Sequence, residues 1–378
     1  MPRARRMHRR LNAGVSLRAV LGAAVAAVAA GCGSLGLSSQ GLSAHAAPAD
    51  GWPSPVIAAT FDGHGWMPAK PAAKRSHLGA GGWNMEFNLV ACPAAGACFA
   101  AGSVNRRADG RVVAGLVARF GQGRWSATER LPGDADQPGT LSCASVSLCV
   151  AVGSATHVLD GVVWKRGPTL PGNASRAVAC AAPDFCIEVQ PTAYRYETFH
   201  RGAWTAPRFI APLPGTNLLP NLLACASPTF CLGMAYGYAY WIFDGTGWTP
   251  GGRIGFPLGG SHWLDPTALS CASPSFCVTV GGNVRGDAMA SVYNGHAWST
   301  PVPVVKRSGY TRLTSVSCPT SRFCAAVGTW SWPPGEFAVT LEADRWSSPT
   351  PLANTEGDPS VACAAATYCV ALTGEVTS

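Results

Sequence analysis

Fourteen of the fifteen cysteines form seven pairs with one shared spacing, C-x5-C, and they are the most conspicuous reactive groups in the chain. Paired thiols can bind a metal, catalyse thiol–disulfide exchange or form disulfides. Zinc sites favour C-x2–4-C with a second pair or a histidine nearby, and redox catalysis favours C-x-x-C, so neither chemistry fits this spacing. We expect no metal, no other cofactor, and the disulfides Cys92–Cys98, Cys143–Cys149, Cys180–Cys186, Cys225–Cys231, Cys271–Cys277, Cys318–Cys324 and Cys363–Cys369.

The residues around each pair predict a two-stranded hairpin. In the clearest copy, residues 269–281, apolar runs flank a Ser/Pro-rich turn between Cys271 and Cys277. Such a turn between apolar runs is typical of antiparallel strands. The two cysteines lie near the ends of the turn, where facing Cβ atoms come within disulfide reach. We expect each disulfide to fix the pairing register of its two strands.

A second recurring unit lies between the cysteine pairs and ends in tryptophan. Its clearest copies are residues 61–66 (FDGHGW), 243–248 (FDGTGW) and 293–298 (YNGHAW). Asp-Gly or Asn-Gly between apolar segments favours a two-residue hairpin turn, in which both central residues have positive φ. Each repeat is therefore expected to hold four strands, with the tryptophan ring in the core between neighbouring sheets. Looser copies of the unit end at Trp125, Trp164, Trp204 and Trp346.

The phase of the two units predicts a closed ring. The first tryptophan unit, at Trp66, precedes the first cysteine pair, whereas the last pair, Cys363/Cys369, has no tryptophan unit after it. The two sets of seven balance only if the N-terminal segment completes the C-terminal sheet. Residues 55–378 divide into seven repeats of about 46 residues, which suits four-stranded blades. We predict an all-β, seven-bladed β-propeller over residues 55–378, with one disulfide in each blade.

Residues 1–31 have the layout of an export signal, with an Arg-rich start and an apolar run from Val20 to Ala30. The run is too short for a membrane-spanning helix, which needs roughly 20 apolar residues. Two exits are open. Residues 28–32 (VAAGC) are similar to a lipoprotein processing box that leaves a lipid on Cys32, whereas residues 44–46 (AHA) form an A-x-A site that releases a free chain. Residues 32–54 are rich in Gly, Ser and Ala and are expected to form a flexible tether.

The charge distribution argues against a nucleic-acid partner. The chain has 28 basic and 20 acidic side chains, a net charge of +8. Six of the arginines lie in residues 1–31, which contain no acid, and without them the balance is 22 against 20, or +2. A nearly neutral body has no field that attracts a phosphate backbone. We expect no nucleic-acid binding, membrane contact only through a lipid on Cys32, and a monomer.

The repeated motif S-C-x-S-x-x-F-C-x-A-V-G, followed by D/N-G-x-x-W, resembles exported and lipoprotein-like propeller proteins of GC-rich Gram-positive bacteria, most of which have no assigned activity. The resemblance covers nearly all of residues 55–378 and implies the propeller fold and export. The D-G-x-x-W element is also distantly similar to the Asp-box of sialidase-like propellers, S-x-D-x-G-x-x-W. When aligned on the tryptophan, Phe61 and Phe243 stand where that box has Asp, so sialidase activity is not carried over.

The motifs of known enzyme classes assign no catalytic residue. No nucleophile elbow, phosphate-binding loop, dinucleotide fingerprint or HExxH occurs. The acids Asp134, Asp136, Glu356 and Asp358 lie in predicted loops, where we expect them to be solvated.

The segments that vary between repeats are expected to emerge together on one face of the ring. Their aromatic, amide and arginine side chains can stack on sugars or hold a peptide. Alternatively, individual rings such as Trp330 and Trp332 only pack their own loop. The candidate binding residues are Trp83, Asn105, Arg106, Arg107, Tyr194, Trp263, Arg285, Tyr310, Trp330 and Trp332.

Three functions remain open at this point. The first is a non-enzymatic binding or scaffold propeller, secreted or lipid-anchored on the outer face of the cell membrane, that recognises an envelope glycan, peptide or protein. The second is a carbohydrate-active enzyme, a glycoside hydrolase or lyase, on the same scaffold, which needs acids and arginines that converge in a central pocket. The third is a spacer without a small ligand. The near-neutral body and the missing catalytic motifs favour the first.

Overall fold

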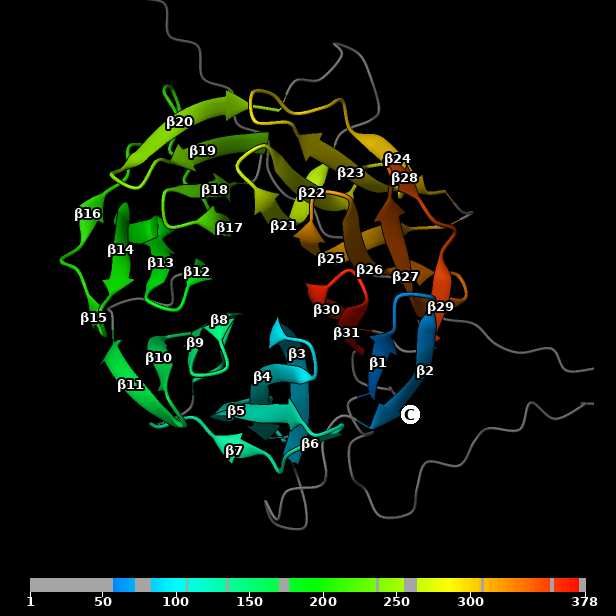
Figure 1. Ribbon diagram of the computed structural model, residues 1–378, viewed down its shortest axis with the longest axis horizontal. Helices are drawn as coiled ribbons and strands as arrows, with labels where there is room; N and C mark the ends of the chain where they lie inside the picture. Colours follow the sequence, from blue (N-terminus) through cyan, green and yellow to red (C-terminus); the bar gives the residue numbers. More distant parts are fainter. Residues whose placement is uncertain are drawn as a thin grey trace, which may run out of the picture. The chain divides into compact units, whose positions relative to one another are not determined.

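Seven antiparallel sheets surround a central channel in the computed structural model (Figure 1). The prediction of a seven-bladed β-propeller with four-stranded blades is confirmed, and three of the blades carry one additional short strand at the outside. Among the described residues η1 (Pro191–Ala193) is a short 3-10 helix, and no helix there has the length and hydropathy of a membrane span. The structure describes residues 57–71, 83–106, 108–133, 136–169, 177–235, 238–254, 264–306, 309–353 and 357–373.

The strands follow the chain blade by blade. Blade 1 consists of β3 (Trp83–Ala94), β4 (Ala97–Arg106), β5 (Val112–Gly121), β6 (Arg124–Trp125) and β7 (Glu129–Arg130). Blade 2 consists of β8 (Thr140–Ser145), β9 (Leu148–Val152), β10 (Ala155–Asp160) and β11 (Val163–Thr169). Blade 3 consists of β12 (Ala177–Ala182), β13 (Phe185–Gln190), β14 (Arg195–His200), β15 (Ala203–Trp204) and β16 (Arg208–Phe209).

The remaining blades repeat this order. Blade 4 consists of β17 (Leu222–Ser227), β18 (Phe230–Met234), β19 (Ala239–Phe243) and β20 (Trp248–Arg253). Blade 5 consists of β21 (Asp265–Ser273), β22 (Phe276–Gly282), β23 (Ala288–Tyr293) and β24 (Val302–Val305). Blade 6 consists of β25 (Thr311–Thr320), β26 (Phe323–Ser331), β27 (Pro334–Glu342), β28 (Arg345–Trp346) and β29 (Thr350–Ala353). Blade 7 consists of β30 (Ser360–Ala365), β31 (Tyr368–Thr373), β1 (Ile57–Phe61) and β2 (Trp66–Pro71).

Blade 7 closes the ring with strands from both ends of the described chain. Its order is β2-β1-β31-β30, and β1 pairs with β31 from Ile57↔Thr373 to Phe61↔Cys369. The ring of Phe61 stacks on Phe323 of blade 6, with centroids 5.5 Å apart. The blue and red strands therefore share one sheet in Figure 1. This confirms the closure that the phase of the repeats predicted.

Each predicted disulfide is present within the hairpin of its blade. We letter the strands of each blade A to D from the central channel outwards. In all seven disulfides the two Cα atoms lie 3.9–4.1 Å apart, and the disulfide joins strand A to strand B. Because each disulfide closes a short loop, we expect a modest gain on the order of 2 kcal/mol per bridge. Seven structural disulfides are typical of an oxidising, extracytoplasmic compartment. Cys32 lies outside the described residues.

Intact mass with and without reduction tests the disulfide set. Seven bridges bind two hydrogens each, so reduction is expected to raise the mass by 14 hydrogens. Before reduction, alkylation of the unfolded protein is expected to modify none of the fourteen paired cysteines. The same spectrum reports whether the protein carries a lipid on Cys32. A mass shift near zero contradicts the pairing.

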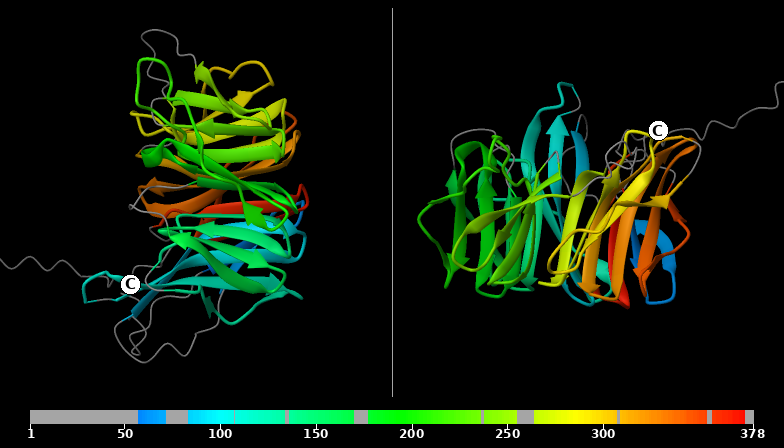
Figure 2. Two further views of the ribbon diagram at one scale, coloured as in Figure 1. Left: turned by 90° about the vertical axis from the view of Figure 1, so that its left-hand side faces the viewer. Right: turned by 90° about the horizontal axis from the view of Figure 1, so that it is seen from above.

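The strands of each blade run between two faces of the ring, which is seen edge-on in Figure 2. Because the pairing is antiparallel throughout, the cysteine loops and the tryptophan turns share one end of the strands, called the turn face here. A Cβ added at Gly245 in a tryptophan turn would lie 3.2 Å from Thr229 in the cysteine loop of the same blade. The B–C connections and the connections to the next blade share the opposite end, the loop face.

The tryptophan turns are of two kinds, and the prediction of a two-residue turn is wrong for the three clearest copies. There Phe61 pairs with Trp66 and Phe243 with Trp248, which leaves four-residue loops. In these loops a side-chain oxygen accepts the hydrogen bonds of the loop N–H groups. Asp244 Oδ1 accepts from the backbone N–H groups of Thr246 and Gly247 at 2.8 and 3.0 Å. Three of the four looser copies do form two-residue turns with both central φ values positive, at Gln122-Gly123, Arg201-Gly202 and Ala343-Asp344. The copy that ends at Trp164 also has a two-residue turn, in which Gly161 alone has a positive φ.

In every blade the tryptophan pairs with the last or the next-to-last residue of the C strand. Five of these partners are aromatic, and their ring centroids lie 5.4–5.6 Å from the indole. The expectation that all seven indoles are core residues is only partly correct. Trp164 and Trp248 are buried, whereas the other five are half-buried.

The serine that precedes the first cysteine of a pair joins neighbouring blades. The hydroxyl oxygens of Ser142, Ser270 and Ser317 each accept a hydrogen bond of 2.9 Å from the backbone N–H of the first cysteine in the next blade. The innermost strand is an edge strand whose N–H groups need partners. The Ser of the S-C motif therefore has an inter-blade role that the sequence did not indicate.

Candidate functional site

Three of the candidate binding residues meet on the loop face, where blades 5 and 6 adjoin. Arg285 lies in the B–C connection of blade 5, Tyr310 in the connection to blade 6, and Trp332 in the B–C connection of blade 6. The exposed side chains are 76% accessible for Trp332 and 50% for Tyr310, and Val284 beside Arg285 is also 76% accessible. We call Val284, Arg285, Tyr310 and Trp332 the aromatic cluster.

Hydrogen bonds hold the three segments of the aromatic cluster together. Tyr310 N–H donates to Ser331 Oγ at 3.0 Å, and Ser331 N–H donates back to the Tyr310 carbonyl at 2.9 Å. Thr311 N–H donates to the carbonyl of Gly286 at 2.7 Å, which joins the loop of blade 5 to the same segment. Gly286 has φ +83° and lies so close to Tyr310 that an added Cβ would be 3.1 Å from its Cα. The exposed rings thus stand on a fixed main chain.

Trp330 supports this cluster from below. Its half-buried ring stacks on the buried ring of Phe337, with centroids 4.8 Å apart and planes 11° apart. Gly335 makes room for it, since an added Cβ there would lie 2.6 Å from the Trp330 Nε1. Trp330 therefore packs within its own blade, as the plainer of the two expectations had it, whereas Trp332 faces solvent.

Three other candidate residues whose side chains the structure describes lie in blades 1 and 3, away from the aromatic cluster. Arg106 forms an ion pair with Asp109 at 3.4 Å on the hairpin of blade 1. Tyr194 stacks on Phe209 in blade 3, with centroids 6.3 Å apart, and Asn105 accepts a hydrogen bond from Ser103. Trp83 begins β3, and its side chain, like Arg107 and Trp263, lies outside the described part of the structure.

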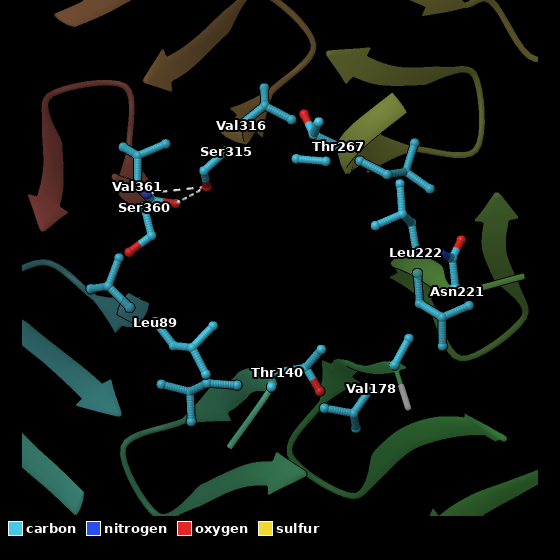
Figure 3. Close-up of a pocket in the computed structure, with 17 residues that line it drawn as sticks. Leu89, Thr140, Val178, Asn221, Leu222, Thr267, Ser315, Val316, Ser360 and Val361 are labelled. Carbon is cyan, nitrogen blue, oxygen red and sulfur yellow. Dashed lines mark hydrogen bonds between the residues drawn. The ribbon is translucent and has the colours of Figure 1, made fainter. Parts of the chain in front are cut away.

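The innermost strands line a central channel of about 300 Å³ (Figure 3). Aliphatic side chains such as Leu89, Leu222 and Val361 alternate around it with hydroxyls and the amide of Asn221. None of these lining residues, all from the described part of the chain, is charged. The described wall of the channel therefore offers hydrogen-bonding groups and no acid–base pair for hydrolysis.

A buried, hydrogen-bonded Asp–His pair lies where blade 1 connects to blade 2, and the expectation that Asp136 is a solvated loop acid is wrong. Asp136 is 4% exposed and His157 is fully buried, with His157 Nε2 at 2.8 Å from Asp136 Oδ2. Asp136 also accepts hydrogen bonds from Ser154 N–H, Ser154 Oγ–H and Ala155 N–H, at 2.6, 2.8 and 3.0 Å.

The pKa of the Asp136 carboxyl reflects these partners. Burial alone raises the pKa, but the hydrogen bonds from His157, Ser154 and Ala155 outweigh it and lower the pKa to about 2. The group is then a carboxylate, so His157 Nε2 carries the proton that it donates. Asp358, by contrast, is exposed as expected and pairs with Arg312 at 2.9 Å, while Asp134 and Glu356 lie outside the described residues.

No family model matches the chain, and no curated protein matches it by sequence. Among solved structures, virginiamycin B lyase from Staphylococcus aureus with quinupristin is similar with a TM-score of 0.55 at 10% identity, over 76% of this chain and 95% of that one. The GH74 xyloglucanase from Xanthomonas campestris gives 0.53 at 12% identity, over 80% of this chain and 52% of that one. YCF48 from Cyanidioschyzon merolae gives 0.50 at 12%, over 77% and 98%. At such identity these likenesses show the seven-bladed β-propeller fold, which hosts many unrelated functions.

Proposed function

We propose that the chain is an extracytoplasmic, non-enzymatic binding propeller that recognises an envelope or extracellular partner through its aromatic cluster. The observation that carries this proposal is the group of exposed side chains on hydrogen-bonded loops. Rings on a fixed main chain present apolar area with little entropy left to lose on binding. A ring of seven disulfide-bonded blades supplies the rigid support that such loops need.

The chemistry of the cluster favours a glycan as the partner, with a peptide or protein as the other outcomes. A pyranose ring has an apolar face that can lie on an indole or phenol, and hydroxyls at its edge. Arg285, which is exposed beside the rings, offers donors for those hydroxyls or for a carboxylate. We further propose that the protein reaches the cell exterior by the export signal, either secreted freely or held by a lipid on Cys32.

Removing the exposed rings tests this proposal. Trp332→Ala and Tyr310→Ala are each expected to weaken partner binding about tenfold or more, because interface aromatics dominate binding energy. The melting temperature is expected to stay within about 2 °C of wild type, since the rings are largely exposed. Binding is measured on glycan and peptide arrays and then by calorimetry.

Phe209→Ala is the matched control, because it removes an equally exposed ring from blade 3. It is expected to leave partner binding unchanged. The proposal is refuted if the wild-type protein binds no ligand on either array, or if wild type and Trp332→Ala bind the ligand equally. Turnover of chromogenic glycosides by the wild-type protein favours the carbohydrate-active enzyme instead.

A further inference from the structure

A second pocket lies on the turn face, at the opposite end of the strands from the aromatic cluster. Its volume is about 600 Å³, twice that of the channel, and it lies between the tryptophan turn of blade 1 and the cysteine loop of blade 2. Pockets for small molecules have volumes of roughly 300–1,000 Å³. The pocket is lined by Ala97, Phe99, Arg119, Phe120, Gly121, Gln122, Arg124, Trp125, Ser126, Ala127 and Val146.

Ala97 forms part of the pocket wall, at a position where blade 1 lacks the large side chain that every other blade has. Ala97 precedes the second cysteine of its pair, and the other blades have large side chains at that position. Where present, the ring fills the space beside the next blade: Phe323 stacks on Phe61 at 5.5 Å, and Phe185 lies 6.3 Å from Phe243. The larger residues are Leu148, Phe185, Phe230, Phe276, Phe323 and Tyr368.

Blade 1 departs from the repeat at a second position of the same pocket, where it places a cation. Arg119 precedes Phe120, the residue that pairs with the tryptophan of the blade. Its backbone N–H bonds to Ser126 Oγ at 3.0 Å, as that of Val292 does to Ser299, so the positions correspond. None of the corresponding residues is charged: they are Thr60, Val158, Thr198, Ile242, Val292 and Thr340.

The contacts of Arg119 leave part of its guanidinium for a ligand. The group lies over the ring of Phe99 at 5.7 Å, and Nη2 donates to the Val162 carbonyl at 2.6 Å. Glu129 approaches Nη2 only to 3.9 Å. Arg119 Nε is shielded from solvent and has no hydrogen-bond partner in the described chain. A buried charged donor without a partner is costly, and native proteins rarely leave one so.

The charges and aromatic rings that line the pocket favour a carboxylate over other anions. Arg124 is a second, exposed cation in the lining, and none of the lining residues is an acid. The guanidinium fork matches a carboxylate, and the rings of Phe99, Phe120 and Trp125 offer apolar walls. A singly charged group suits aromatic walls better than a phosphate dianion, because dehydrating the dianion costs more.

We propose that this pocket, the Arg119 pocket, binds a monocarboxylate with a flat apolar body. The carboxylate pairs with the partly exposed guanidinium of Arg119 and is screened by Arg124, while the apolar body lies against Ala97 and the aromatic walls. Two sources share this chemistry: a free aromatic acid, and a peptide whose C-terminal residue is aromatic. The site is independent of the aromatic cluster, so either proposal can fail alone.

Calorimetric titration of the purified protein with matched probes tests the pocket. Phenylacetate is expected to bind in the millimolar range or tighter, and neutral phenylacetamide about tenfold more weakly, since it lacks the charge that Arg119 recognises. A tetrapeptide ending in Phe is titrated as free acid and as amide. Tighter binding of the peptide acid than of phenylacetate identifies a peptide terminus as the source, and the reverse identifies a free acid.

Two variants return blade 1 to the pattern of the repeat and so keep the fold. Ala97→Phe fills the pocket and Arg119→Thr removes its cation, and each is expected to weaken phenylacetate binding about tenfold or more. Arg322→Thr, which removes an exposed arginine from the cysteine loop of blade 6, is the control and is expected to bind as wild type. The proposal is overturned if no probe binds, if acid and amide bind equally, or if folded Ala97→Phe binds as wild type.

Discussion

Deletion of residues 1–71 is expected to abolish cooperative folding, whereas deletion of residues 1–54 leaves the melting temperature unchanged. The longer deletion removes β1 and β2, the two outer strands of blade 7. It exposes the edge of β31 and uncovers Phe323, on which Phe61 stacks. Truncation of one buried Phe alone costs about 3–5 kcal/mol, against a total stability of about 5–15 kcal/mol for a domain.

The loss is expected to appear in three measurements on the longer deletion. Near-ultraviolet circular dichroism and the thermal transition report lost packing, and size-exclusion chromatography reports association through the unpaired edge of β31. A synthetic peptide of residues 55–71, added in trans, is expected to restore the transition, because β1 has no covalent tie to β31. If the longer deletion melts like wild type, ring closure does not stabilise the protein.

The ring was predictable because its signal is local and repeated. Each of the seven C-x5-C motifs predicts two paired strands. The position of Trp66 before the first cysteine pair indicates that the N-terminal strands complete the C-terminal blade. Cross-strand pairing depends on neighbours within a few residues, so one copy of the repeat predicts the others. The paired cysteines also define the register of the first two strands, because two disulfide-bonded residues face each other across the hairpin.

The turns were less predictable because one dipeptide can serve two hairpin geometries. In residues 61–66 and 243–248 the Asp side chain accepts two backbone N–H groups and stabilises a longer loop. Gln122-Gly123 has no such acceptor and forms the two-residue turn. The choice rests on side-chain hydrogen bonding to the main chain, which competes with regular turn types.

The sites were the least predictable part, because they depend on contacts between blades. Sequence reasoning selected Arg285, Tyr310 and Trp332 from varied segments, but only the structure separates them from Arg106 and Tyr194. It missed Arg119 and His157 altogether. Arg119 had a signal, since the other repeats have apolar residues or Thr at its position. His157 had a weaker one, because blade 3 has Glu197 and blade 5 has Ser291 at the corresponding position. Departures of this kind mark positions with a role of their own.

Asp136→Ala is expected to destabilise the fold by about 3–5 kcal/mol. The change leaves His157 and the N–H groups of Ser154 and Ala155 buried without their acceptor. When one partner of a buried pair is removed, the other stays buried without its hydrogen bond and still carries the cost of its desolvation. The partner left by an exposed pair is solvated by water instead. Chemical denaturation at pH 7 gives the free energy of unfolding for both proteins.

Acid is expected to erase part of this difference, and the direction follows from the pKa. Asp136 has a pKa of about 2 in the folded protein and an ordinary value of 3.8. Its carboxylate therefore stabilises the fold fully above about pH 4, and this contribution, about 2 kcal/mol, disappears as the pH falls towards 2. The gap between wild type and Asp136→Ala narrows over that window.

Asp358→Ala separates this effect from a general loss of negative charge. Asp358 occupies the connection from blade 6 to blade 7 and pairs with Arg312 at the surface, where ion pairs contribute about 0–1 kcal/mol. Its removal is expected to change the free energy of unfolding by no more than that at any pH. If the two variants are equally stable at pH 7, or if the gap between wild type and Asp136→Ala is the same at pH 7 and pH 2, the Asp136 carboxylate does not stabilise the fold in the way that its pKa implies.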